Sequence, residues 1–141
     1  MTVSICTLAH GRSTHLANLV TGLSQSNVLP DELVIAVMQD NAYHLPDAPF
    51  PVRQRILGSG AIPLARARNT AAREAEGELL IFLDVDCIPH PACVPDYIAA
   101  SRSHGGVFMG EVGYLPKGST DAGVDFARFE SVAVRHTERP G

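Results

Sequence analysis

The chain has 141 residues, of which 45% are hydrophobic and 18% are charged, and its formal net charge is −4. This length and balance are typical of one globular domain and exclude a disordered chain. The excess of acidic residues and the absence of a basic run exclude a protein built to coat nucleic acid.

The first third of the chain predicts a strand, a helix and two further strands. Residues 3–9 are the first strand, and Ser13 or Thr14 is expected to cap the helix that follows. Residues 33–38 are apolar throughout, which predicts a strand buried on both faces. Residues 39–51 contain three prolines and predict a loop, and residues 52–57 predict a strand near a sheet edge. The apolar stripe of the helix consists of Leu16, Leu19, Val20 and Leu23.

The middle of the chain predicts two helices and two strands. An Ala-rich helix is expected over residues 63–76, with Pro63 in its first turn and Gly77 just past its end. Residues 79–83 form the most apolar run, which predicts the central strand of the sheet. Residues 107–112 predict a further strand. The second helix is expected to open at Pro89 and Pro91, to place Val94, Tyr97 and Ile98 on one face, and to stop at Gly105.

The order of these segments, β-α-β-β-α-β-α-β, predicts an α/β fold with a mostly parallel sheet and helices on both faces. We expect one domain over residues 1–141. Within residues 113–141, Phe126, Phe129 and Ala133 could line one face of a helix. Ligands of such sheets bind outside the carboxyl ends of the strands, so the residues that follow each strand are the candidates for function.

Asp84 and Asp86 come directly after the apolar run at residues 79–83. Residues two apart in an extended chain point the same way, so the two carboxylates can converge on one spot. A cation relieves their repulsion, and Mg²⁺ or Mn²⁺ is the natural partner of such oxygen ligands and of a phosphate-bearing substrate. The alternative is a solvated turn in which Asp86 caps the next helix. The position at the end of the strand favours the metal site.

Other polar residues are expected at the same edge of the sheet. His10, Gly11 and Arg12 follow the first strand, and Gly11 permits close approach of the backbone to a ligand. Asp40, with Gln39 before it, follows the second strand and could contact a nucleobase or ribose. Arg68 on the Ala-rich helix could offer its planar guanidinium to a diphosphate, although its spacing alone favours a solvated helix face.

Three stretches of the sequence resemble the family 2 glycosyltransferases of the GT-A fold. They are Val3-Ser-Ile-Cys-Thr-Leu-Ala-His-Gly-Arg12, then Ala67-Arg-Asn69 with Ala75-Glu-Gly-Glu78, and Leu80-Ile-Phe-Leu-Asp-Val-Asp86. The resemblance extends from residue 3 to residue 112. It implies a Rossmann-like nucleotide-binding half, and an enzyme that transfers a sugar, with inversion, from a nucleotide diphosphate donor to an acceptor hydroxyl.

The same resemblance implies roles for individual residues. Asp86 would bind Mn²⁺ or Mg²⁺, and Asp84 would contact the ribose or the waters of the metal. Arg68 would lie along the donor nucleotide, for which a uridine diphosphate sugar is the first expectation. Arg12 and Asp40 are the further candidates for contact with the nucleotide. The acceptor, a saccharide, lipid or protein, is not specified by the sequence.

The chain departs from the pattern of the family in three places. Leu8 and His10-Gly11 replace the usual Pro and Tyr-Asn after the first strand. Val37 and Met38 align with the usual Asp pair of the second strand, which leaves Asp40 as a displaced substitute. The catalytic base of the family has no matching residue here. The carboxylates available for that role are Glu111, Asp121, Asp125 and Glu130.

Three alternatives to a complete glycosyltransferase are left open. The chain could be a nucleotide-sugar-binding module without turnover, or the donor-binding half of a longer enzyme. A haloacid-dehalogenase-like phosphatase would use Asp84 as its nucleophile. Against that class, Cys87 stands where those enzymes have Thr, and no acidic pair follows Lys117, the only lysine.

Location and association are predicted only in outline. Cys6, Cys87 and Cys93 form neither a CxxC pair nor a disulfide framework, and the N-terminus has no signal-peptide pattern, which favours the cytoplasm. No apolar stretch has the length of a membrane span, so contact with a membrane would be peripheral. A half-domain with an uncovered sheet edge or apolar face would be expected to form a homo-oligomer.

Overall fold

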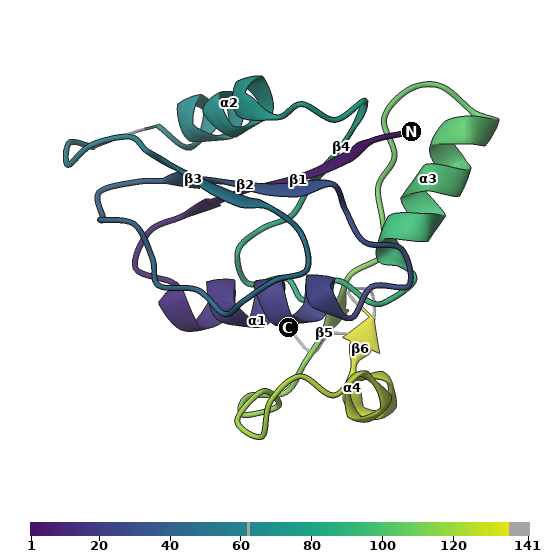
Figure 1. Ribbon diagram of the computed structural model, residues 1–141. Coiled ribbons are helices and arrows are strands. Elements are labelled where there is room, and N and C mark those ends of the chain that lie inside the picture. Colours follow the sequence, from purple (N-terminus) through teal and green to yellow (C-terminus); the bar gives the residue numbers. More distant parts are fainter. Residues whose placement is uncertain (62, 136–141) are drawn as a thin grey trace.

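Four parallel strands form the central layer of the protein, with α1 on one face and α2 on the other, as the computed structural model shows (Figure 1). The structure describes residues 1–61 and 63–135. The sheet consists of β1 (Val3–Ala9), β2 (Glu32–Val37), β3 (Val52–Ile56) and β4 (Leu79–Phe82), in the order β3-β2-β1-β4. The helices are α1 (Ser13–Ser24), α2 (Leu64–Glu74), α3 (Cys93–Ser103) and α4 (Phe126–Val132).

The register of the sheet places two apolar layers on its two faces. β1 pairs in parallel with β2, from Ser4 opposite Glu32 to Ala9 opposite Val37, and β2 is buried at every position. The layer under α1 contains the predicted helix stripe, which is fully buried. The layer under α2 is built from smaller side chains, namely Cys6, Val34, Ala36, Met38, Ala67 and Ala71. The α/β fold with helices on both faces is therefore confirmed.

The predicted helix ends are wrong in detail. Arg12, not Ser13 or Thr14, is the N-cap of α1, and no side chain caps that end. Pro63 is the N-cap of α2 rather than a first-turn residue, and α2 ends at Glu74. The C-cap Ala75 is already extended, and the amide of Gly77 donates a hydrogen bond to Ser4 Oγ at 2.8 Å.

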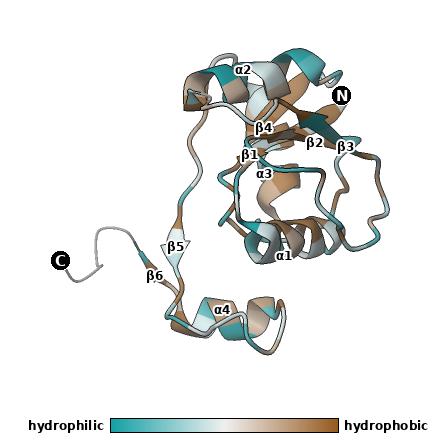
Figure 2. Cartoon of the chain, turned by 90° about the vertical axis from the view of Figure 1, so that its left-hand side faces the viewer, coloured by the Kyte–Doolittle hydropathy of each residue, from teal (hydrophilic) through white to brown (hydrophobic). Residues whose placement is uncertain are grey.

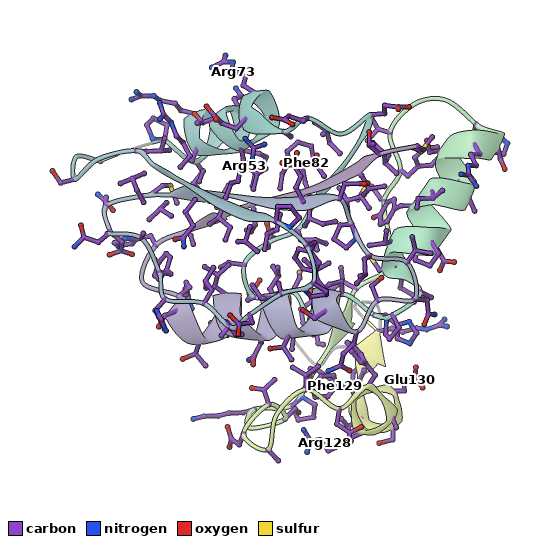
Figure 3. The ribbon with its side chains drawn as sticks, in the orientation of Figure 1. Arg53, Arg73, Phe82, Arg128, Phe129 and Glu130 are labelled. Atoms are coloured by element: carbon purple, nitrogen blue, oxygen red, sulfur yellow. The ribbon has the colours of Figure 1, made fainter. Side chains whose placement is uncertain are left out.

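Two predictions about strands are also wrong. The run at residues 79–83 is not the central strand, because β4 lies at the edge of the sheet among the described residues. α2 packs over β1 and β2, so Phe82 of β4 stays 47% exposed on the α2 side (Figure 3). Residues 107–112 form no strand, and Val107 is 96% exposed. An apolar pattern predicts that a segment packs against other apolar residues. It does not predict which element of the fold covers the segment.

The end of the described chain forms an arm that stands apart from the sheet (Figure 2). It contains α4 and an antiparallel pair of short strands, β5 (Gly113–Tyr114) and β6 (Val134–Arg135). Phe129 is buried in the arm and packs edge-on against Phe126, as predicted for one helix face, whereas Ala133 is only the C-cap. Residues 136–141 lie outside the described part of the chain. No helix in residues 1–61 and 63–135 is long and apolar enough to cross a membrane.

The buried carboxylate of Glu32 links the amino-terminal ends of the strands to the segment that follows α2. Glu32 Oε1 accepts hydrogen bonds from Ser4 Oγ at 2.5 Å and from the Glu76 amide at 2.7 Å. Its other oxygen accepts from Arg53 Nη2 at 2.5 Å, and Arg53 lies on the α2 side of the sheet (Figure 3). Because α2 also carries Arg68, this network helps to set where that side chain lies at the opposite end of the strands.

We expect Gly77→Ala to lower the free energy of unfolding by about 2 kcal/mol, because the new methyl group overpacks a backbone contact. A Cβ at Gly77 would lie 2.6 Å from the nitrogen of Ser4 and 2.6 Å from its hydroxyl oxygen. Gly105→Ala is the control, since a Cβ there meets no atom within 4 Å. Urea unfolding of both variants checks the prediction, and equal midpoints for the two would contradict it.

Candidate functional site

Asp84 and Asp86 lie in the turn that follows β4. The ladder with β1 continues one residue past the strand, because the Leu83 amide donates to Cys6 O at 3.0 Å. The chain then turns, and the Cys87 amide donates to Asp84 O at 2.9 Å. Both aspartates are exposed. Asp86 does not cap the next helix, since the N-cap of α3 is Ala92. The helix cap expected of Asp86 in that alternative is therefore wrong, although both aspartates do lie in a solvated turn.

Arg68 reaches this turn from α2. Buried Ala67 and Ala71 allow α2 to pack closely on β1, and this places Arg68 at the carboxyl end of the sheet. Its Nη2 lies 4.0 Å from Asp84 Oδ1. Both side chains are largely exposed, at 47% and 79%, so the ion pair adds little to stability. The two charges therefore remain available to a ligand.

A small pocket of about 20 Å³ lies between α2, β1 and the end of β4. Arg68 and Asp84 are its charged lining residues, and the hydrophobic part comes from both strands and the helix. Its position outside the carboxyl ends of parallel strands is where ligands of such sheets bind. The lining consists of Cys6, Thr7, Leu8, Arg68, Ala71, Phe82, Leu83 and Asp84.

The two aspartates fit a hard divalent cation that is shared with a ligand. In the described residues no three His, Cys, Asp or Glu side chains come together to hold a metal ion. The protein therefore supplies two carboxylates at this turn. Mg²⁺ is commonly bound by one or two carboxylates, with phosphate oxygens and waters completing the shell. Binding of Mn²⁺ or Mg²⁺ here remains a prediction.

Cys87 is next to the aspartates but is not suited to bind such a cation. Burial, and then the negative charges of Asp86 and Asp84, raise the pKa of its thiol. The thiol is therefore protonated at neutral pH, and sulfur is a soft ligand that hard cations do not prefer. Cys87 is therefore not expected to hold the cation.

The carboxyl ends of β1 and β2 lie side by side, as predicted. Asp40 forms hydrogen bonds with other residues of the protein there. Asp40 Oδ2 accepts a hydrogen bond from the Gly11 amide at 2.7 Å, and the hydroxyl of Tyr43 donates to the same oxygen. Arg12, which follows Gly11 in the chain, is exposed. Tyr43 was missed by the sequence analysis, and the only signal was an aromatic residue in a polar loop three positions after Asp40.

The four candidates for a catalytic base do not line the pocket at the end of β4. They lie in the arm or on the segment that leads to it. Glu111 Oε1 lies 3.1 Å from Arg135 Nε, and Asp125 caps α4 by accepting from the Arg128 amide at 3.2 Å. Glu130 Oε1 lies 2.6 Å from Nε2 of His90 (Figure 3 labels Glu130 on α4). Asp121 is an exposed turn residue. A role as base stays a prediction for each of them.

Comparison with known proteins identifies the family of one stretch of the chain. Residues 58–127 match the family described as "Glycosyl transferase family 2". This stretch includes Arg68 and both aspartates of the turn after β4. Residues 58–127 belong to glycosyl transferase family 2. The comparison with curated proteins finds no match.

Solved structures share the fold of this chain. The structure of S. aureus TarS 1–349 matches with a TM-score of 0.58 and 19% sequence identity, over 74% of this chain and 33% of that one. TarS 1–349 in complex with UDP-GlcNAc matches with a TM-score of 0.59 and 19% identity, over 74% of this chain and 32% of that one. The complex with UDP matches with a TM-score of 0.58 and 19% identity, over 74% and 33% of the two chains. The chain thus spans about a third of the length of these TarS structures.

Proposed function

We propose that this chain forms the donor site of a glycosyltransferase that moves a sugar from a uridine diphosphate sugar to an acceptor hydroxyl. The observation that carries the proposal is the convergence of Arg68 and Asp84 on one pocket at the carboxyl ends of the strands, inside the stretch that matches family 2. The complexes of TarS with UDP-GlcNAc and UDP, which have the same fold, support a uridine nucleotide as donor.

The charges of the site suit a nucleoside diphosphate. The guanidinium of Arg68 is a planar donor that can pair with two oxygens of a diphosphate. Asp84 and Asp86 would hold Mn²⁺ or Mg²⁺, which neutralises charge on a departing diphosphate when it is bound. The exposed position of both aspartates leaves room for the diphosphate and for water beside them.

The proposed reaction is a direct displacement with inversion. The oxygen of the acceptor hydroxyl forms a bond to the anomeric carbon, and the bond from that carbon to the diphosphate oxygen breaks. The electron pair of that bond leaves with the nucleoside diphosphate. The hydroxyl proton passes to a carboxylate base, for which Glu111, Asp121 and Asp125 are the candidates of this chain. The acceptor would be a saccharide, a lipid or a protein.

A second candidate function is a nucleotide-sugar-binding module without turnover. One observation favours it: the candidates for a base, Glu111, Asp121 and Asp125, are not among the residues that line the pocket. Both candidates require the donor site. Transfer of the sugar to an acceptor would exclude the binding module.

The first experiment is a calorimetric titration of UDP into the protein with Mn²⁺, and then with a chelator in its place. We expect a dissociation constant of roughly micromolar size with Mn²⁺ that is at least about tenfold weaker after chelation, because the two carboxylates need a cation to accept a diphosphate. Equal affinity in both conditions would exclude the metal site. Lack of UDP binding in both conditions would exclude the proposed donor.

A further inference from the structure

The turn after β1 is fixed by a cluster of hydrogen bonds from the loop after β2. Gly11 has a φ of 60°, a left-handed conformation, and its amide donates to Asp40 Oδ2 at 2.7 Å and to Tyr43 Oη at 3.0 Å. The Tyr43 hydroxyl in turn donates to Asp40 Oδ2. One carboxylate oxygen therefore accepts both the amide of the turn and the hydroxyl that touches it.

Tyr43 is itself anchored to the sheet. Its amide donates to Gln54 Oε1 at 2.7 Å, and Gln54 Nε2 donates to Tyr43 O at 2.8 Å. Gln54 belongs to β3, and the ring of Tyr43 packs against the core under α1. The contacts thus form a continuous line from β3 through Tyr43 and Asp40 to the turn at Gly11.

The opposite side of the turn is held as well. His10 Nδ1 lies 3.0 Å from the carbonyl oxygen of Met38, which can only accept, so Nδ1 carries the proton. The hydrogen bond from Tyr43, and then that from Gly11, lowers the pKa of Asp40 below its ordinary value. The carboxylate is therefore ionised and remains a strong acceptor for the Gly11 amide at neutral pH.

This cluster lies at the same carboxyl end of the sheet as the candidate donor site. The turn at residues 10–12 continues β1, whose Thr7 and Leu8 line the pocket with Arg68 and Asp84. Asp40 follows β2, the parallel neighbour of β1. A left-handed glycine turn without partners would have to be ordered when a ligand binds, and that ordering weakens binding.

We propose that Asp40 and Tyr43 are positioning residues, which hold the Gly11 turn ready for a nucleoside diphosphate, and that Asp40 does not read the nucleobase. This inference rests on the proposed function. A residue that positions the turn affects all nucleotides alike, because its partners are protein groups. A residue that reads the base would instead change the preference among bases.

The test compares Asp40→Ala, Asp40→Asn and Tyr43→Phe for binding of UDP, CDP and GDP in Mn²⁺. We expect Asp40→Ala to lower the affinity for every nucleotide that binds by the same factor of about ten. This is the scale of one lost charge-assisted hydrogen bond. Asp40→Asn keeps an oxygen for the Gly11 amide, so it should recover most of the affinity. Asp47→Ala, an exposed carboxylate of the same loop, is the control and should bind as the wild type does.

A second readout follows the turn itself. Hydrogen exchange of the Gly11 amide should accelerate in Asp40→Ala and in Tyr43→Phe, and combining the two changes should weaken UDP binding little more than Asp40→Ala alone. Faster exchange with unchanged UDP affinity would mean a structural role only and would overturn the inference. A changed ratio between UDP and GDP affinities in Asp40→Ala would overturn it too. Failure of the wild type to bind any nucleotide would instead remove the proposed function, and the inference with it.

Discussion

Asp86→Asn is expected to abolish the Mn²⁺-dependent part of UDP binding while the fold is retained. The amide has the shape of the carboxylate but no charge, and a hard divalent cation needs anionic oxygen when the protein supplies only two ligands. Asp86 is exposed in a turn outside the helices and strands, so the change removes no buried contact. We expect the affinity for UDP in Mn²⁺ to fall by about a hundredfold, toward the value measured in chelator.

Calorimetry and thermal unfolding together check this prediction. Asp96→Asn is the matched control, because Asp96 is another exposed aspartate, in the first turn of α3. Both variants should unfold within about 2 °C of the wild type, since exposed substitutions seldom change stability by more than a few tenths of a kcal/mol. Wild-type affinity of Asp86→Asn in Mn²⁺ would refute the assignment of the metal ligand.

Glu32→Ala is expected to lower the free energy of unfolding by about 3 kcal/mol, the scale of breaking a buried, hydrogen-bonded ion pair. Glu32 is only 7% exposed, and its two oxygens accept from Ser4, the Glu76 amide and Arg53. Removing the carboxylate leaves the Ser4 hydroxyl and the Glu76 amide without their acceptor. It also releases the segment that follows α2, the helix on which Arg68 lies.

The pKa of Glu32 adds a dependence on pH. Burial alone would raise this pKa, but the hydrogen bonds from the Glu76 amide, Ser4 and Arg53 and the charge of Arg53 outweigh it and lower the pKa below its ordinary value of 4.5. The unfolded chain therefore takes up the proton at a higher pH than the folded one. The stability contributed by the carboxylate is complete above pH 4.5 and is lost as the pH falls through the lowered folded pKa.

Urea unfolding of the wild type, Glu32→Gln and Glu32→Ala at about pH 7 and about pH 3 measures both effects. Glu32→Gln keeps the size of the side chain, so its difference from the wild type reports the charge. We expect this difference to shrink at the lower pH. Glu78→Ala is the control, because Glu78 is exposed. A difference between wild type and Glu32→Gln that stays constant or grows at low pH would contradict the assigned role.

The local sequence pattern was sufficient to predict the buried face of single helices and strands. The stripe from Leu16 to Leu23 predicted the buried face of α1, because helical spacing alone decides which side chains share a face. The apolar run of β2 predicted a strand covered on both sides for the same kind of reason. The family resemblance at Ala67-Arg-Asn69 and Asp84-Val-Asp86 named Arg68 and Asp84, which the structure brings to one pocket.

Contacts between segments far apart in the chain were decided by the tertiary structure. The sequence placed Asp40 at the end of β2, and the fold decided that its carboxylate accepts from the amide of Gly11, which lies 29 residues away. Nothing in the sequence marked Glu32 as important, because it is a single charged residue before an apolar run. Its stabilising role depends on hydrogen bonds from Ser4, Arg53 and Glu76, which the fold brings to the same buried carboxylate. The edge position of β4 also depends on strand order, which periodicity does not encode. Periodicity thus determines which side chains share a face, and the packing of distant elements determines whether that face is buried and what each polar group meets.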